Sequence, residues 1–347
     1  MKKGPDLGSA LQEQIPSLSL WQEIELIGVD EASLGPESTD QAHNIAAHVR
    51  VHGNVQADEL LDLEHLQHGE HWLDFGLGLL VGSFLNVVIL RLPARLEAAW
   101  QEEAIAVLGI EDRPAPEKPP GIVREPSHCP RCKHRLAWYD NIPVLGWLLL
   151  RGRCRYCREP ISVQYPLVEL LSGLCSAAIV WRFGAGWPAL AGLAFTWALI
   201  ALSGIDLRTQ LLPDQIVYPL LWLGLLLSLW PFMVAPGAAI LAAAIGYLSL
   251  WSVYWGFRLL TGKEGMGHGD FKLLAALGAW MGLGCLLPVV LLSSLIGAVV
   301  GVTLMALKRH ERDVPLPFGP FIAAAGWVWF VAGDRLWAAY AHLTGLH

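Results

Sequence analysis

Four of the six cysteines stand in two pairs with the same internal spacing. Cys129 and Cys132 form the first pair, and Cys154 and Cys157 follow after 21 residues. Each pair supplies two thiolates from one tight turn, and four thiolates complete the tetrahedral shell of a zinc ion. Such an ion has no open position for substrate, so we expect a structural site; two disulfides or a redox pair are the alternative interpretation.

Acidic residues in or beside apolar segments are the second candidate for chemistry. An aspartate at mid-bilayer costs about 2.5 to 3.5 kcal/mol on insertion scales, so it is retained mostly where it works or pairs. The short list is Glu169, Asp206, Asp214 and Asp270. Counting the apolar segments places Asp206 and Asp270, which are 64 positions apart, on the same side of the membrane.

A glycine-rich loop leads into the last of these aspartates, with the sequence Gly265-Met-Gly-His-Gly-Asp270-Phe-Lys272. Glycines allow a backbone to come close to a neighbour and to adopt conformations closed to other residues, so this loop suits the packing of an extended peptide against a carboxylate. Two carboxyl groups in a partly desolvated cleft tend to share one proton. One then activates water and the other donates to the peptide carbonyl, which is aspartyl-protease chemistry.

Each of these residues also has a structural interpretation. An aspartate at the end of a span is often a solvated residue or a helix N-cap, and Asp214 fits the N-cap of the next span better than it fits chemistry. Glu169 can pair with an arginine of the preceding loop. Lys272 either anchors its span at the interface or acts as a counter-charge near Asp270.

The elements that must position these residues are membrane spans. Of the 347 residues 54% are hydrophobic and 16% are charged, against about 25% charged in a soluble domain. We predict an all-α polytopic membrane protein, because the apolar runs are long enough to cross about 30 Å at 1.5 Å per residue. Breaks are expected at Pro231 to Gly237 and near Gly282 to Gly284 or Pro288. The eight predicted spans are 73–92, 165–183, 187–206, 215–234, 238–259, 270–284, 286–307 and 318–341.

The distribution of lysine and arginine predicts the orientation. If the first span runs inward, 19 of the 24 basic residues fall on the cytoplasmic side, where short basic loops tend to remain. The cysteine pairs then lie in a reducing compartment, which favours zinc over disulfides. The net charge of −7 and the lack of a basic domain argue against a nucleic-acid partner.

Four regions result from this interpretation. Residues 1–70 form an acidic polar extension, in which only the run 58–68 has a helical pattern. Residues 71–92 form the first span, residues 93–164 a cytoplasmic loop stapled by zinc, and residues 165–347 a membrane domain of seven spans.

Taken together, the motifs resemble the type IV prepilin peptidase family. They occur in order over about 73 to 334. The matching pieces are Gly82-Ser-Phe-Leu-Asn86-Val-Val-Ile-Leu-Arg91-Leu-Pro93, the two cysteine pairs, Asp140-Asn-Ile-Pro143, Tyr165-Pro-Leu-Val-Glu169-Leu, Ile205-Asp206 through Leu212-Pro-Asp214, Gly265 to Trp280, and Pro317-Phe-Gly-Pro320.

The resemblance implies an intramembrane aspartyl protease of the bacterial inner membrane, with Asp206 and Asp270 as the catalytic pair and its active site facing the cytoplasm. Gly267, Gly269 and Lys272 would support the catalytic loop. The implied substrates are type IV prepilins and pseudopilins of type II secretion, which have a short basic leader before an apolar helix. Cleavage is expected after a glycine, at the cytoplasmic face of the membrane. The enzyme itself would be in contact with membrane lipid.

The resemblance further implies methylation of the new amino terminus by S-adenosylmethionine. No strand-associated dinucleotide fingerprint occurs, and the near miss Gly76-Leu-Gly78-Leu-Leu-Val-Gly82 lies in a span, where small residues more often serve helix packing. Gly152 and Arg153, just before the second cysteine pair, are a candidate part of the methyl-donor site; a turn that starts the zinc knuckle is the alternative.

Two other functions fit parts of the pattern. In a secondary transporter, Asp206 and Asp270 would bind a coupling proton or ion and the glycine loop would be a broken helix. However, the sequence shows no internal repeat. A non-catalytic zinc-knuckle scaffold would leave two aspartates on one face without a purpose.

Overall fold

The computed structural model describes residues 57–109, 118–230, 234–307 and 316–344. The chain divides into two units, residues 1–65 and 66–347. The predicted extension falls mostly outside the described residues, although the run 58–68 lies within the first described helix. The membrane helices and the cysteine loop all belong to the second unit.

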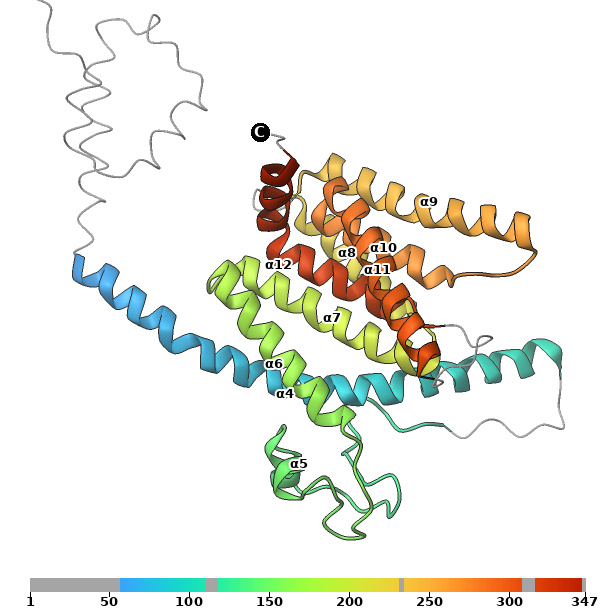
Figure 1. The fold of residues 1–347 in the computed structure, drawn as a ribbon. Helices are drawn as coiled ribbons and strands as arrows, with labels where there is room; N and C mark the ends of the chain where they lie inside the picture. Colours follow the sequence, from blue (N-terminus) through green and yellow to red (C-terminus); the bar gives the residue numbers. More distant parts are fainter. Residues whose placement is uncertain (1–56, 110–117, 231–233, 308–315, 345–347) are drawn as a thin grey trace, which may run out of the picture. The chain divides into compact units, whose positions relative to one another are not determined.

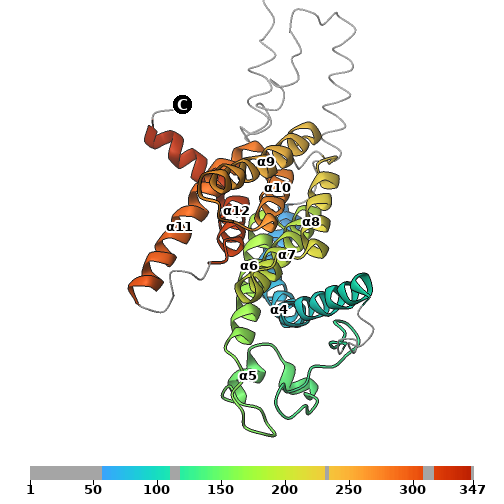
Figure 2. The ribbon, with the colours of Figure 1, turned by 90° about the vertical axis from the view of Figure 1, so that its right-hand side faces the viewer.

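The described part of the chain is helical and contains no β-strand, which confirms the predicted fold class (Figures 1 and 2). The elements are α4 (Ala57–Leu108), η2 (Trp138–Asn141), α5 (Leu145–Leu149), α6 (Gln164–Phe183), α7 (Trp187–Thr209), α8 (Asp214–Leu227), α9 (Pro236–Thr261), α10 (His268–Met281), η3 (Leu283–Cys285), α11 (Leu286–Ala306) and α12 (Gly319–Thr344).

Five helical segments of the described chain are long and apolar enough to cross a membrane. They are 72–108, α6, α7, α9 and 283–306. The predicted number of eight is not confirmed. Helices α8 and α10 have 14 residues each, which corresponds to about 21 Å and falls short of a hydrocarbon core of about 30 Å.

Helix ends follow the predicted breaks in two places and depart from them in a third. Helix α10 stops at Gly282, whose φ of +75° favours glycine, and α8 and α9 are separated between Leu227 and Pro236. The predicted end of the first span at residue 92 is not a helix end, because α4 continues through Pro93 to Leu108. The residues after Pro93 are rich in alanine, leucine and glutamate, which are strong helix formers.

Helices α4 and α6 approach each other through small residues. A Cβ atom on Gly78 would lie 2.6 Å from Ser176 Oγ, and one on Gly82 would lie 2.7 Å from Glu169 Cα. These glycines therefore serve the close packing of two helices.

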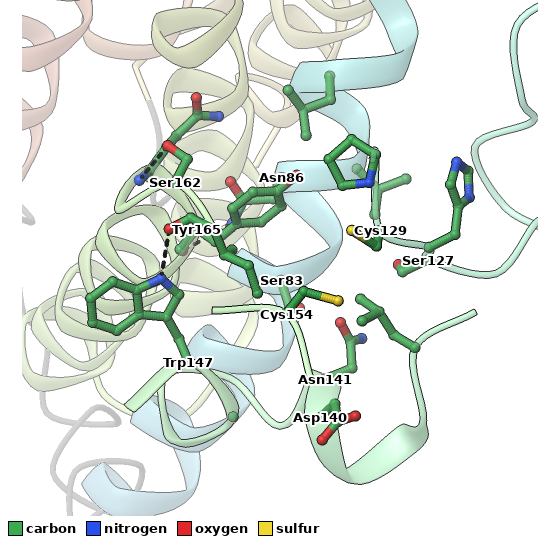
Figure 3. A pocket seen from close by; sticks show the side chains of 18 of the residues that line it. Ser83, Asn86, Ser127, Cys129, Asp140, Asn141, Trp147, Cys154, Ser162 and Tyr165 are labelled. Atoms are coloured by element: carbon green, nitrogen blue, oxygen red, sulfur yellow. Dashed lines mark hydrogen bonds between the residues drawn. The ribbon is translucent and has the colours of Figure 1, made fainter. Parts of the chain in front are cut away.

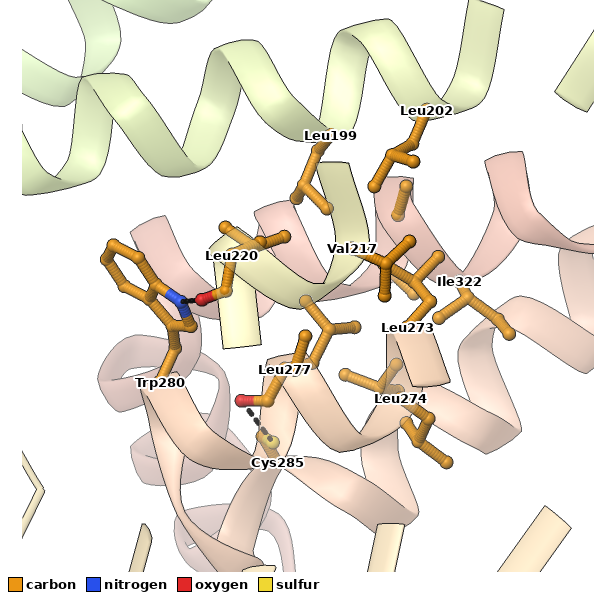
Figure 4. Packing of buried hydrophobic residues seen from close by; sticks show 14 of the residues in the cluster. Leu199, Leu202, Val217, Leu220, Leu273, Leu274, Leu277, Trp280, Cys285 and Ile322 are labelled. Atoms are coloured by element: carbon orange, nitrogen blue, oxygen red, sulfur yellow. Dashed lines mark hydrogen bonds between the residues drawn. The ribbon is translucent and has the colours of Figure 1, made fainter. Parts of the chain in front are cut away.

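Helix α10 is the centre of the hydrophobic core. It packs against α8, α9 and α12, and every residue from Asp270 to Trp280 is buried except the half-buried Lys272. The Trp280 indole N–H donates to the Leu220 carbonyl at 2.8 Å, and Cys285 is fully buried in the same cluster (Figure 4). A helix that is apolar on every side belongs inside a bundle, so Asp270 is held on a rigid element.

Candidate active site and cysteine centre

Asp206 and Asp270 line one pocket of about 380 Å³. Asp206 lies in the last turn of α7 and is 5% exposed, whereas Asp270 lies in the first turn of α10 and is 6% exposed. The fold therefore brings together two acidic side chains that are distant in the sequence and largely removed from solvent.

The beginning of α12 holds the first carboxylate in place. The Gly319 backbone N–H donates to Asp206 Oδ2 at 3.0 Å. A Cβ atom at Gly319 would lie 2.6 Å from that oxygen. Gly319 is thus required for a close approach of the α12 backbone to Asp206.

The glycines before Asp270 also allow neighbouring atoms to come close, but their backbone dihedral angles are ones that other residues can adopt. Neither Gly267, whose φ is −76°, nor Gly269 is among the residues with positive φ, so the expectation of conformations closed to other residues is wrong. A Cβ atom on Gly269 would lie 2.7 Å from Leu212 Cβ, while one on Gly267 would come only within 3.7 Å of Asp270 Oδ2. Gly269 therefore allows α10 to pack against the segment before α8.

Lys272 and Asp214 form an ion pair in the wall of this pocket. Lys272 Nζ lies 2.7 Å from Asp214 Oδ1 and 3.0 Å from Oδ2. The predicted N-cap role of Asp214 is wrong, because Pro213 occupies that position and makes no side-chain cap. Lys272 has a partner on α8 and is not a free counter-charge for Asp270.

Two apolar residues of α4 complete the pocket and were not predicted. Leu96 and Trp100 lie beyond Pro93, on the part of α4 that was expected to be loop. Their spacing of four residues places both on one helix face. That spacing, in a segment of strong helix formers, is the signal that would have revealed them.

The four paired cysteines meet at a single point. Their Sγ atoms all lie within 4.8 Å of one another, and Cys129 Sγ lies 3.7 Å from Cys157 Sγ. Tetrahedral zinc with Zn–S bonds of about 2.3 Å places its sulfur ligands about 3.8 Å apart. The residues present therefore fit a zinc ion, and none of the described cysteines forms a disulfide.

The two cysteine turns share one backbone design. Cys129 N–H donates to the His134 carbonyl and Cys154 N–H to the Glu159 carbonyl, five residues later in both cases. Residues four positions after these cysteines, Lys133 and Arg158, both have φ of 59°. Backbone N–H groups of the second turn, first that of Cys157, lower the pKa of the Cys154 thiol to about 7, which favours the thiolate.

A second pocket, of about 570 Å³, lies between the cysteine loop and the helices (Figure 3). Its walls come from α4, the start of α6, the end of α7 and the loop. In this loop the Arg155 guanidinium donates to Asp140 at 2.9 Å, so the second cysteine turn is tied to the Asp140 segment. We refer to this second pocket as the loop pocket.

Gly152 and Arg153 are not among the residues that line the loop pocket. Gly152 has φ of +67°, and a Cβ atom there would lie 2.7 Å from the Trp147 ring. Its N–H donates to the Trp147 carbonyl at 2.9 Å. These contacts support the alternative in which Gly152 makes the turn that starts the second cysteine knuckle.

Comparison with known proteins identifies the relatives of this chain. Residues 77–183 match the bacterial peptidase A24 N-terminal domain and residues 193–302 match the type IV leader peptidase family. A prepilin leader peptidase/N-methyltransferase of Xanthomonas campestris is 55% identical over 271 residues, covering 78% of this chain and 94% of the relative. The chain belongs to the type IV leader peptidase family.

Other members of the family are similarly close. Proteins of the same name from Aeromonas hydrophila and Pseudomonas aeruginosa are 52% and 49% identical, covering 79% and 78% of this chain and 96% and 92% of the relatives. No solved structure matches the chain. Membership of this enzyme family confirms the resemblance seen in the sequence, and the transporter alternative is not supported.

Proposed function

We propose that this protein removes the leader peptide of prepilins and pseudopilins by aspartyl-protease chemistry, with Asp206 and Asp270 as the catalytic pair. The observation that carries the proposal is the meeting of these two buried carboxylates in one pocket. A family of leader peptidases supplies the substrate class.

The mechanism follows from two carboxyl groups that share one proton. The ionised carboxylate takes a proton from a water molecule, which attacks the peptide carbonyl, while the protonated carboxyl donates to the carbonyl oxygen. The amide nitrogen then receives a proton and the C–N bond breaks. The Gly319 N–H holds Asp206 in position for this exchange, and Leu96 and Trp100 provide an apolar wall for the peptide.

The enzyme then methylates the free amino group that cleavage creates, as the names of its relatives suggest. S-adenosylmethionine supplies the methyl group: a bond forms from nitrogen to the methyl carbon, the carbon–sulfur bond breaks, and the nitrogen loses a proton. S-adenosylhomocysteine is the second product.

A structural zinc ion would hold the cysteine loop together. Cys129, Cys132, Cys154 and Cys157 would provide all four ligands, and the separation of their sulfur atoms supports this assignment. With every position filled by sulfur, the ion stabilises the loop and takes no part in peptide cleavage.

The protein lies in the bacterial inner membrane, in contact with lipid, with both pockets facing the cytoplasm. The five apolar helices support a membrane location, and the excess of lysine and arginine on one side supports the orientation.

The proposed function is tested by measuring prepilin cleavage by variants in which one of the two pocket aspartates is replaced. Asp206→Asn and Asp270→Asn proteins, purified in detergent, should each lose cleavage of a prepilin by at least a thousandfold, measured by mass spectrometry of the product. Asp334→Asn is the matched control, because its carboxylate is 85% exposed and pairs with Arg182 outside the pocket. Full activity of either pocket variant would refute the assignment.

A further inference from the structure

The loop pocket contains buried polar atoms that have no partner within the protein. Asn86 is 1% exposed, and its amide N–H₂ donates to the carbonyls of Gly82 and Tyr165 at 3.3 and 3.1 Å, but Asn86 Oδ1 accepts no hydrogen bond. Gln164 Oε1 accepts from Arg208 at 2.8 Å, while Gln164 Nε2 donates to nothing. Buried polar groups are normally paired, so this acceptor and this donor are available to a polar ligand.

A buried carboxylate lines the same pocket without a cationic partner. Glu169 is 6% exposed, and its Oε2 accepts the Val144 backbone N–H at 2.7 Å. The ion pairs of the described residues do not include Glu169, so the pairing with a loop arginine expected from the sequence is wrong. A positively charged ligand would stabilise the ionised form of such a buried carboxylate, so Glu169 favours a cationic group beside it.

The size and the mixed lining of the loop pocket suit a small molecule. Its volume of about 570 Å³ lies within the range of about 300 to 1,000 Å³ that is usual for such sites. The aromatic side chains of Trp147 and Tyr165 line it beside the polar groups (Figure 3). This combination fits a molecule with a flat heteroaromatic part, hydrogen-bonding groups and a positive charge.

We propose that the loop pocket binds S-adenosylmethionine, with Glu169 facing its positively charged end and with Asn86 and Gln164 as polar contacts. The proposal rests on the proposed methyl transfer and names the site for it. S-adenosylmethionine has an adenine ring, hydroxyl groups, a sulfonium, an ammonium and a carboxylate. The lining offers aromatic side chains for the ring, Glu169 for the positive charges, and cationic residues for the carboxylate, namely Arg91, Lys133, Arg155 and Arg208.

The end of α7 connects the loop pocket to the pocket of the two aspartates. Asp206 lines the aspartate pocket and Arg208, two residues later, lines the loop pocket. Two residues correspond to a rotation of about 200° and a rise of about 3 Å along a helix. A new amino terminus released beside Asp206 therefore has to pass only the end of this helix to reach the methyl donor.

Direct binding measurements test the proposal on the full-length protein in detergent. Isothermal titration of S-adenosylmethionine should give a Kd at least tenfold weaker for Glu169→Gln and for Gln164→Leu than for the unchanged protein. Glu264→Gln is the matched control, since Glu264 pairs with Arg258 and lines neither pocket. Zinc content and melting temperature, measured on each variant, establish that it is folded.

Binding of a second ligand shows whether Glu169 recognises the positive charge of the methyl donor or only its shape. S-adenosylhomocysteine lacks the sulfonium charge, so Glu169→Gln should weaken its binding less than that of S-adenosylmethionine, whereas Gln164→Leu should weaken both to a similar extent. At limiting methyl donor, the methylated fraction of cleaved prepilin should fall in both variants.

The outcomes distinguish this proposal from the proposed function. If the unchanged protein neither cleaves nor methylates a prepilin, the proposed function fails. If it does both, and folded Glu169→Gln and Gln164→Leu proteins bind the donor with unchanged Kd, the function stands and the assignment of the loop pocket is overturned. Weaker binding of a prepilin amino terminus, with unchanged donor affinity, would assign the pocket to the pilin instead and also overturn the proposal.

Discussion

Lys272 Nζ lies 2.7 Å from Asp214 Oδ1, and this ion pair joins the second turn of α10 to the first turn of α8. The same ammonium stands 5.1 Å from the centre of the Tyr218 ring on α8. Because Lys272 follows Asp270 by two residues, the pair positions the beginning of the helix that carries the second carboxylate.

Breaking this pair should lower cleavage without abolishing it. The Lys272 and Asp214 side chains are 23% and 47% exposed, and such a pair contributes about 0.2 to 1 kcal/mol. We expect Lys272→Met and Asp214→Asn each to lower kcat for leader cleavage by about tenfold or less. The double variant should lose no more than either single one, since both remove the same contact. Additive losses would show that Lys272 acts on the reaction by itself.

Gly319→Ala should impair cleavage strongly. The added methyl group would lie 2.6 Å from Asp206 Oδ2, so the carboxylate or the start of α12 has to move and the bond from the Gly319 N–H is lost. We expect at least a tenfold loss of kcat in the detergent assay. Gly256→Ala is the control, because a methyl group there meets nothing within 4 Å and alanine favours a helix. Equal activities of the two variants would contradict this role of Gly319.

Sequence reasoning located the aspartate pair because the physics of membrane spans is simple. Long apolar runs must cross the bilayer, so counting them assigns a side to each acidic residue. Even with fewer long helices than expected, Asp206 and Asp270 share one pocket. The paired cysteines were equally accessible, since their spacing alone prescribes a tetrahedral site.

The partners of single polar residues were not accessible from the sequence. Glu169 accepts a backbone N–H of Val144 instead of an arginine, and Asp214 binds Lys272 instead of capping its helix. Such partners depend on the orientation of each helix, which periodicity does not give for helices that are apolar on several sides. The loop pocket could not be predicted either. Its walls come from four segments far apart in the chain, and the sequence does not show how these segments meet.

Two glycines before Asp270, at the start of α10, should respond differently to alanine. A methyl group on Gly269 would lie 2.7 Å from Leu212 Cβ, whereas one on Gly267 finds its nearest neighbour at 3.7 Å. Neither residue has a positive φ, so the difference is one of space. We expect Gly269→Ala to lower kcat at least tenfold and Gly267→Ala to lower it less than threefold, both measured on the same prepilin. The reverse order would show that conformational freedom at Gly267 matters more than packing at Gly269.

Loss of one cysteine ligand should release the zinc ion and loosen the loop. Cys154 is 1% exposed and its Sγ belongs to the cluster of four, so Cys154→Ser removes a buried ligand from a site that contributes directly to folding of its loop. We expect the zinc content, measured by mass spectrometry of the metal, to fall from about one ion per chain to below about 0.2, with faster proteolysis between residues 118 and 163. Cys175→Ser is the matched control, because Cys175 lies on α6 outside the cluster.

Since Cys129 and Cys154 also line the loop pocket, affinity for S-adenosylmethionine should fall in Cys154→Ser and not in the control. A Cys154→Ser protein that retains a full complement of zinc would show that the four sulfur atoms do not act as one site.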